Sequence, residues 1–573
     1  MLAPFTNNIF ATTNAMQHFF IDDIFKIIIV ANDKQVDGLI QTISLADFNF
    51  NRKVGFDFAA LAASYCCKNS KYYQSEFIIP KLEIIIQGLQ KYQTEDGTVN
   101  IGNLESPPDT AFLLEPLCAA THLLIKTNSV AASNAIAGIK SFILKAGDAL
   151  VTGGVHTPNH RWVVCAALAR INVLYPNKIY MDRIEDWLGE GIFMDSDGHY
   201  PERSRIYSSV ENNSLLTMGR LLNKPALFDY AKRNLSSSYY YMEPDGSLVT
   251  TDSRRQDQFM AKTIVSYYLH YRFLAIKNND RNFAGICKLI EQMKGFEEEI
   301  MNRSLFYFLD NEMLQQQLPT ATELVIDYEK FFATSQLLRI RRDKTTTTLF
   351  GGADWPIIIA SGRSNSPNFF SYRKGDAILK YLRLSSSFFA MGYFYSQGIK
   401  KDGNKYILHK KLAIPYYQPL PKNKRNAKGD YKLSPSIDDR FWNKMDFENR
   451  PVSNVKTLDT TITFMGNKGT NELNFEVKGL AGIAVTIELC FGEGGKLSGV
   501  TLAKDDNSFL ENGMGIYEFG EDSIQFGPGA VAQKTITNLE GERYSTHFGS
   551  LRTKGMYVYI TGVTPFKHQL IFS

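Results

Sequence analysis

Apolar residues in the first half of the chain recur at the three- and four-residue spacing of amphipathic helices. The helical stretches come in pairs, and a short glycine-containing segment separates the two members of each pair. Four such segments lie roughly 50 residues apart, at Asp96-Gly97, Gly153-Gly154, Asp197-Gly198 and Asp245-Gly246. The helices predicted before them are 77–92, 135–144, 181–189 and 226–236, and those predicted after them are 111–125, 161–174, 211–222 and 259–275.

The second helix of each pair is richer in Leu, Ala, Val and Ile, which predicts deeper burial. A repeated helical hairpin of this length predicts an open solenoid or a closed (α/α) toroid of inner and outer helices. In a toroid, the connections from outer to inner helices all lie at one end. We therefore expect the glycine-containing segments to share one rim, with glycine supplying the positive φ of the turns.

The pattern changes after residue 310, where helical spacing gives way to short alternating segments bounded by Gly, Asn, Asp and Pro. Turn signals such as Asp402-Gly403 and Asn512-Gly513 indicate antiparallel strands. The expected strands include 345–350, 377–384, 460–465, 473–477, 484–490 and 556–561. We predict a multidomain α and β protein, with an (α/α) toroid over 1–315 and an antiparallel β-sheet domain over 316–573, joined by a linker at 315–320.

Composition narrows the class of protein. Hydrophobic residues make up 44% and charged residues 21% of the chain, as in ordinary globular proteins. No apolar run is long enough to span a membrane, and a net charge of +4 spread along the chain argues against a nucleic-acid partner. The six cysteines show no metal-ligand spacing, so we expect free thiols, no metal and no cofactor. The basic segment Lys422–Lys428 is interpreted as a solvated loop.

Three of the four glycine-containing segments are followed by residues that can bind an anion or transfer a proton. The second leads to Asn159-His160-Arg161, the third to Glu202-Arg203-Ser204-Arg205-Ile206-Tyr207, and the fourth to Arg254-Arg255. β-Elimination in a uronic-acid glycan requires neutralisation of the carboxylate, a base for the C5 proton and an acid for the leaving oxygen. Asn, His and Arg can neutralise the carboxylate, whereas Tyr or His can act as acid or base. The residue set therefore predicts an acidic glycan as substrate.

Each residue also has a structural explanation. Asn159 could cap the following helix, and His160 could be a hydrogen-bonded core residue. Tyr207 could pack on an inner helix, and Glu202 could form an ion pair with a neighbouring arginine. The expected convergence of these residues on one rim favours the functional interpretation.

The run Asp197-Gly198-…-Glu202-Arg203-Ser204-…-Tyr207 resembles the Asp-Gly-x-x-x-Glu-(Arg/Gln)-Ser-x-x-Tyr-His motif of the heparinase II/III-like and alginate-lyase-like toroid polysaccharide lyases. The resemblance implies an incomplete toroid followed by an antiparallel β-sandwich. It also implies that Tyr207 is the acid, that Asn159 neutralises the carboxylate, and that His160 neutralises it or acts as base. The residues expected to bind substrate are Arg161, Glu202, Arg203, Arg205, Arg254, Arg255, Tyr372 and His409.

Two features depart from the motif. Ser208 follows Tyr207 where the family commonly has His, and no His-x-Asp-x-Gly segment occurs in the β-domain. The corresponding region offers Tyr372 and Arg373, and His409 is the β-domain histidine favoured to reach the substrate. The identity of the base is left open. Among divergent lyases of this layout are gut-bacterial enzymes that remove rhamnose from glucuronic acid, and the chain is a candidate for that group.

Two other functions remain as alternatives. A glycoside hydrolase would need two carboxyl groups across the scissile bond, which Glu202 with Asp257, or Asp109 with Asp252, could supply. A non-catalytic protein could use the same rim to bind an acidic glycan. For the favoured lyase, the resemblance implies a bacterial protein of the periplasm or exterior, although the N-terminus lacks a signal-peptide pattern. We expect a monomer or a small homo-oligomer.

Overall fold

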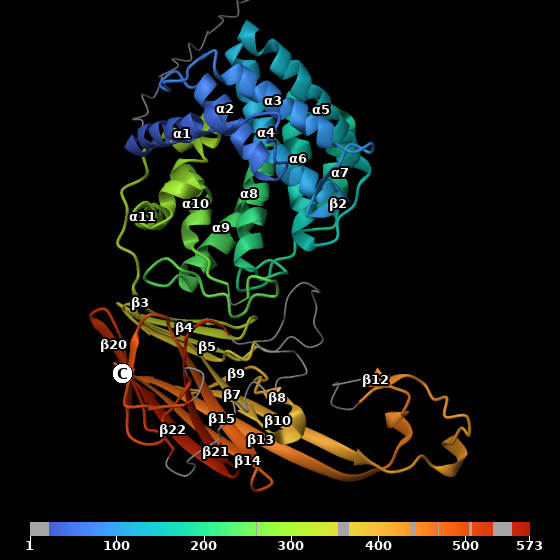
Figure 1. Cartoon of the computed structure of the whole chain (residues 1–573), viewed down its shortest axis with the longest axis vertical. Coiled ribbons are helices and arrows are strands. Elements are labelled where there is room, and N and C mark those ends of the chain that lie inside the picture. The colour runs from blue at the N-terminus through green and yellow to red at the C-terminus, as the bar shows by residue number, and fades with distance from the viewer. Residues whose placement is uncertain are drawn as a thin grey trace, which may run out of the picture. The chain divides into compact units, whose positions relative to one another are not determined.

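The computed structural model describes residues 22–258, 260–352, 366–436, 442–467, 469–503, 507–530 and 553–573. The chain forms two compact units, each assembled from more than one segment (Figure 1). The helical unit comprises residues up to 191, then 211–232 and 265–324. The β-unit comprises residues 192–210, 233–264 and 325–573. Two stretches that lie between helices in sequence therefore belong to the β-unit.

The helices of the first half follow the predicted repeat. Their bounds are α1 Asp23–Thr42, α2 Lys53–Cys66, α3 Ile78–Tyr92, α4 Pro107–Thr127, α5 Ser133–Thr152, α6 Pro158–Leu174, α7 Lys178–Gly189, α8 Arg205–Leu221, α9 Leu227–Ser238, α10 Tyr268–Asn278, α11 Arg281–Ile290 and α12 Leu305–Asp310. A short hairpin, β1 Val99–Ile101 with β2 Asn103–Ser106, precedes α4. The unit boundaries run through α8 and α9.

The inner and outer roles of the helices agree with their composition. Helix α4 packs between α2 and α6, and all three are buried over most of their length. Helices α3, α5 and α7 pack against one another on the outside and bury one face each. The hairpin prediction is therefore confirmed, and inner helices are apolar on all sides because neighbours surround them.

Two local predictions are wrong. The helix expected over 259–275 begins only at Ile264 with a 3₁₀ turn that leads into α10, because Thr263 is extended and pairs with Ser247. Gly97, Gly198 and Gly246 have positive φ as expected, but Gly153 has φ −73°. Gly153 lacks a side chain for another reason, since Pro107 and the Ala149 carbonyl would contact a Cβ there.

The helical unit contains a buried ion-pair network beside a cavity of about 50 Å³. Arg170 contacts Glu115 at 2.6 Å and Asp310 at 3.1 Å, and Arg220 also pairs with Asp310. Burial opposes ionisation of Asp310, but Arg170 and its other partners outweigh it and hold the pKa of that carboxyl well below its usual range. Opposite charges compensate one another here, so the network has a structural role.

The β-unit contains two large sheets. The first has the order β16-β19-β20-β22-β14-β13-β10-β9, and the second has the order β17-β18-β21-β15-β7-β6-β5-β4-β3 with β8 beside β7. The bounds are β3 Asp327–Phe332, β4 Leu337–Arg342, β5 Thr345–Phe350, β6 Phe370–Lys374, β7 Ala377–Ser386, β8 Gly392–Tyr393, β9 Ile399–Asp402, β10 Lys405–Tyr417, β11 Ser434–Pro435, β12 Trp442–Asn443, β13 Val452–Asn467, β14 Thr470–Gly479, β15 Ala484–Phe491, β16 Lys496–Ser498, β17 Thr501–Leu502, β18 Asn507–Phe509, β19 Gly515–Phe519, β20 Asp522–Gly527, β21 Met556–Val563 and β22 Phe566–Phe572.

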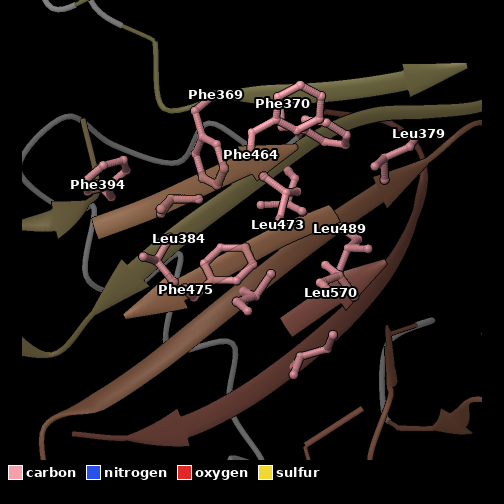
Figure 2. Close-up of a cluster of buried hydrophobic side chains, with 14 of the residues drawn as sticks. Phe369, Phe370, Leu379, Leu384, Phe394, Phe464, Leu473, Phe475, Leu489 and Leu570 are labelled. Carbon is pink, nitrogen blue, oxygen red and sulfur yellow. The ribbon is translucent and has the colours of Figure 1, made fainter. Parts of the chain in front are cut away.

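The two sheets form a sandwich around a common apolar core. Phe370 and Leu379 from one sheet meet Phe464, Leu473 and Leu570 from the other (Figure 2). Strand pairs between described residues are antiparallel except β18 with β21. The alternation of buried and exposed residues along β13 and β14 is what places one face of their sheet in this core.

The six expected strands are present, and the segment after Gln315 carries no helix or strand before Asp327. The six cysteines are free thiols, as predicted. Within the described part of the chain, none of the helices is long and apolar enough to cross a membrane.

Candidate active site

Tyr207 lies in the first turn of α8, and the preceding loop fixes its position in the β-unit. The Ser204 hydroxyl accepts a hydrogen bond from the Tyr207 backbone N–H at 3.1 Å. The Asp257 carboxylate accepts from the Arg205 backbone N–H at 2.8 Å and from the Ser253 hydroxyl at 2.5 Å. A serine and a carboxylate at a helix start satisfy its free N–H groups and favour its dipole. Helix α8 therefore begins at a defined residue.

The half-buried phenol of Tyr207 has a charged and a polar neighbour. The Arg255 guanidinium lies 4.2 Å from the ring centre, and the Gln256 side-chain amide donates a hydrogen bond to the phenolic oxygen at 2.6 Å. Arg255 is held in place by Glu202, whose carboxylate it contacts at 2.5 Å. The cation contacts the face of the ring, and the amide donor fixes the orientation of the phenolic oxygen. This arrangement suits a tyrosine that exchanges a proton.

A second network buries the arginine that starts α8. Arg205 pairs with Asp252 at 2.5 Å and lies 3.7 Å from the centre of the Tyr241 ring. Tyr241 donates its hydroxyl proton to Asp252 at 2.9 Å, so its oxygen accepts a hydrogen bond from His199 Nε2 at 3.0 Å. Burial, with the positive charge of Arg205, lowers the pKa of His199 to about 3. His199 is therefore a neutral structural residue.

The loops around Tyr207 are anchored on the sheet of the same unit. The Asp197 carboxylate accepts hydrogen bonds from the backbone N–H groups of Ala333, Thr334 and Ser335, at 3.2, 2.7 and 3.2 Å. These residues form the turn between β3 and β4. Further along, Arg373 on β6 pairs with Asp245 at 2.7 Å. The segment that carries the motif is therefore attached to the β-sandwich.

Asn159 and His160 lie in the helical unit, at the start of α6. The helix begins at Pro158, with Thr157 as the N-cap residue, so Asn159 is not the cap that its structural explanation required. Asn159 is buried and donates to the Thr157 hydroxyl at 3.2 Å. His160 is 8% exposed, and its ring lies 4.8 Å from the ring of His156 in an edge-to-face arrangement.

The first turns of α2, α4 and α6 bring further polar residues near His160. The Phe112 ring on α4 lies 6.1 Å from the His160 ring, and the Arg52 guanidinium lies 4.7 Å from the centre of Phe112. Arg52 also pairs with Asp109 in the first turn of α4. These inner helices are neighbours, so their N-terminal turns form one edge of the helical unit. Arg161 turns away to pair with Glu190 at 2.7 Å.

Five of the residues expected to contact substrate are buried in the β-unit, and one of them is Arg255, which is 5% exposed. Glu202 is fully buried against Arg255, and Arg205 is buried against Asp252. Arg203 is 3% exposed and has φ +47°, an unusual backbone conformation for arginine. Tyr372 lies in the sandwich core, where desolvation raises its pKa to about 12. These side chains contact the loop or the core, and their contact with substrate stays a prediction.

The remaining predicted residues are more accessible. Arg254 is partly exposed and donates to the Pro201 carbonyl at 2.9 Å. The His409 side chain is 48% exposed and contacts Asp459 at 2.8 Å on the outer side of β10. Arg255, Arg254 and Tyr207 are thus gathered around one loop, whereas His409 lies on a separate strand.

The carboxylates required by the hydrolase alternative are occupied. Asp257 caps α8, and Glu202 is paired with Arg255. Asp252 is paired with Arg205, and Asp109 with Arg52. Each of these carboxylates is at least 98% buried. A hydrolase needs one free carboxylic acid and one free carboxylate facing the substrate, and these pairs do not offer them.

Sequence reasoning missed Gln256, His156 and Arg52. Gln256 directly follows Arg255, and His156 lies four residues before His160 in the same connection. Both positions were visible as polar residues in a loop already singled out. Arg52 carried no such signal, because no motif marks the start of α2.

Comparison with solved structures identifies the fold. A Paenibacillus xanthan lyase aligns with 96% of the chain at TM-score 0.56 and 11% identity, and the chain spans 57% of its length. The chondroitin AC lyase of Streptomyces coelicolor A3, solved with chondroitin sulphate, aligns with 96% of the chain at TM-score 0.53 and 12% identity, over 79% of its own length. The chain has the fold of the (α/α)-toroid polysaccharide lyases.

A heparinase III shows the same toroid-lyase fold, with TM-score 0.50 and 9% identity over 90% of this chain and 75% of its own. No model of a known protein family matches the chain, and no curated protein matches it either. The toroid-lyase fold confirms the resemblance inferred from the Asp197–Tyr207 motif and the predicted order of toroid and β-sandwich.

Proposed function

We propose that the protein is a polysaccharide lyase that cleaves a uronic-acid glycan by β-elimination. The observation that carries this proposal is the environment of Tyr207, where Arg255 lies against the ring and Gln256 donates to the phenolic oxygen. The occupied carboxylates of the hydrolase alternative support the same choice.

The proposed reaction breaks a C–H bond and a C–O bond of the same uronic acid. A base removes the C5 proton, the electron pair forms the C4=C5 double bond, and the C4–O bond to the leaving sugar breaks. The base that takes the C5 proton is either Tyr207 or His160. If it is Tyr207, the same proton passes on to the departing oxygen. If it is His160, Tyr207 donates its own proton to the departing oxygen and regains one from His160. No water is consumed, so the products are one unsaturated uronic acid and one sugar with a free hydroxyl.

Neutralisation of the substrate carboxylate is assigned to Asn159 and His160. Both lie in the first turn of α6, where the helix dipole favours an anion. Their donors would stabilise the negative charge that develops on the carboxylate as C5 loses its proton. Arg254, Arg161 and His409 are proposed to bind acidic groups of neighbouring sugars.

The first substrate to test is a glycan with rhamnose at C4 of a terminal glucuronic acid, from which an exo-acting enzyme would release rhamnose. The family resemblance supports this choice, and it also supports a periplasmic or secreted location in a bacterium.

The proposal is tested with a panel of uronic-acid glycans, by following the ultraviolet absorbance of the unsaturated product. The wild-type protein is expected to generate absorbance, and Tyr207→Phe and His160→Ala are each expected to lower the rate by about 100-fold or more. Tyr92→Phe, which removes a partly exposed hydroxyl from the helical unit, serves as the control and should retain full activity. New reducing ends without absorbance would establish a hydrolase, and no product with any glycan would leave only a binding function.

A further inference from the structure

Strands β10 and β13 extend beyond the sheet that contains them. Strand β9 pairs with β10 only over Lys405–Leu408, and β14 pairs with β13 only from Leu458 onward. Residues 413–417 and 452–457 pair with each other alone among the strands of the described residues. At about 3.4 Å per residue, this ribbon extends roughly 17–20 Å past the sheet. Figure 1 shows it running out to the loops around β12. We call the described residues between 413 and 457 the arm, and residues 418–436 and 442–451 its tip.

The tip has a defined structure of its own. Gln418 donates its backbone N–H to the Pro451 carbonyl at 2.7 Å, and the Tyr417 and Phe447 rings lie 4.7 Å apart. Farther out, β11 pairs with β12. Lys444 contacts Asp430 at 2.5 Å and ties the loop that precedes β11 to the residues that follow β12. These contacts connect the described segments of the tip to one another.

The sequence of the tip carries a net positive charge. Residues 418–451 include eight Lys and Arg but five Asp and Glu, whereas the whole chain of 573 residues has a net charge of only +4. Four exposed lysines, at 422, 424, 428 and 432, have no carboxylate partner within the described residues. Two lysines elsewhere in the unit are paired, Lys401 with Glu329 and Lys567 with Glu476. Unpaired cations on a loop favour an anionic ligand.

The tip also contains an exposed tryptophan. The Trp442 side chain on β12 is 64% exposed, although large aromatic side chains are usually covered. Lys444, two residues after Trp442, pairs with Asp430. A flat aromatic ring binds the apolar C–H face of a sugar, and nearby lysines bind its carboxylate or sulfate groups.

We propose that the tip of the arm binds anionic polysaccharide chains, with Trp442 stacking on a sugar ring and Lys422, Lys424 and Lys428 contacting its acidic groups. The inference rests on the proposed function for the acidic nature of the ligand. The arm would hold a long chain while sugars at its end are cleaved elsewhere in the molecule. A second copy of this protein is a poorer occupant, because two tips would bring like charges together.

The test is affinity electrophoresis of the full chain in native gels that contain alginate, polygalacturonate or heparan sulfate, with neutral dextran as reference. The Tyr207→Phe background prevents cleavage of the gel matrix under the proposed function. We expect at least one of the three acidic polysaccharides to retard the protein. The variants Lys422→Gln/Lys424→Gln/Lys428→Gln and Trp442→Ala should each weaken this binding at least about tenfold.

The matched control is Lys478→Gln/Lys496→Gln/Lys567→Gln, which removes the same charge from exposed positions on β14, β16 and β22. Its affinity should stay within about twofold of the parent. In the active background, arm variants should keep full activity on short oligosaccharides and lose activity only on long chains. Full activity on short oligosaccharides would show that the substitutions leave the fold and the catalytic residues intact.

Three outcomes would overturn the inference: no acidic polysaccharide retards the parent protein, the arm variants bind as the control does, or light scattering shows that they convert a dimer into a monomer. The last result would make the arm an interface between copies. Arm-dependent binding without cleavage of any glycan by the wild-type protein would refute the proposed function but support the inference about the arm.

Discussion

At the scale of single residues, the loop around Tyr207 contains two kinds of side chain: exposed ones and buried ones that keep their neighbours in position. Gln256 is exposed and donates to the phenolic oxygen, whereas Glu202 is buried and acts through Arg255. The sequence places all of these residues in two short loops but does not show which of them pair. Which arginine pairs with which carboxylate depends on the directions of the side chains, and an Arg-rich sequence does not determine these directions.

Gln256 is expected to position and polarise Tyr207. Gln256→Leu removes a donor whose hydrogen bond to a developing phenolate has a net value of about 1.5–3 kcal/mol. We expect kcat to fall roughly 10- to 100-fold with little change in KM. Steady-state kinetics on the cleaved glycan would measure this, with Gln569→Leu, at an exposed position on β22, as a control. An unchanged kcat would show that Gln256 has no part in the reaction.

His199 makes the stability of the β-unit sensitive to acid. Its pKa is about 3 in the folded state and about 6.5 in the unfolded chain, so the unfolded state takes up the proton first. Stability from neutral His199 is fully present above pH 6.5 and is lost as pH falls toward 3, by about 2 kcal/mol between pH 7.5 and pH 5.

His199→Gln should remove this part of the pH dependence, since glutamine does not titrate. Chemical unfolding at the two pH values would compare the variant with the wild type and with His409→Gln, whose side chain is 48% exposed. If His199→Gln loses as much stability on acidification as the wild type, His199 is not the group responsible.

At the scale of elements, the inner helices and the strands were predictable because each has a repeating apolar pattern and clear glycine boundaries. The start of α10 was not predictable, since Thr263 is drawn into an extended pairing with Ser247 that depends on distant contacts. The start of α6 was predicted three residues late, at Arg161, although Pro158 is a typical first residue of a helix. The attachment of the Asp197 loop to the β3–β4 turn had no signal in the local pattern.

Asp197 is expected to be the anchor of the loop that carries Tyr207. Asp197→Ala removes a charged acceptor from three backbone N–H groups, which should destabilise the β-unit by about 1.5–3 kcal/mol and lower kcat. The adjacent Ser196→Ala removes one exposed hydroxyl contact with Thr334 and should change stability by less than about 0.5 kcal/mol. Thermal unfolding and activity would be measured together. Equal effects of the two substitutions would refute the anchoring role.

At the scale of the whole molecule, the two halves of the sequence do not coincide with the two compact units. The order of toroid and sandwich followed from the change of periodicity, but the assignment of residues 192–210 and 233–264 to the β-unit did not. Those segments read as ordinary connections between helices. Their hydrogen bonds to the sheet, made by Asp197 and Asp245, are what attach them to the second unit.

For the whole molecule, the prediction concerns the products of the reaction. Elimination consumes no water, whereas hydrolysis places an oxygen atom from water in one product. The two reactions are therefore distinguished by the mass of the uronic acid product, which elimination leaves lighter by one water, independently of which residue is the base.

The most direct measurement is the reaction of the wild-type protein with the uronic-acid glycan panel in oxygen-18-labelled water, followed by mass spectrometry of the products. The account predicts an unsaturated uronic acid, lighter by one water than its saturated form, and no heavy oxygen in the released sugar beyond exchange at its anomeric centre. A saturated uronic acid as the product of cleavage would contradict elimination and establish hydrolysis.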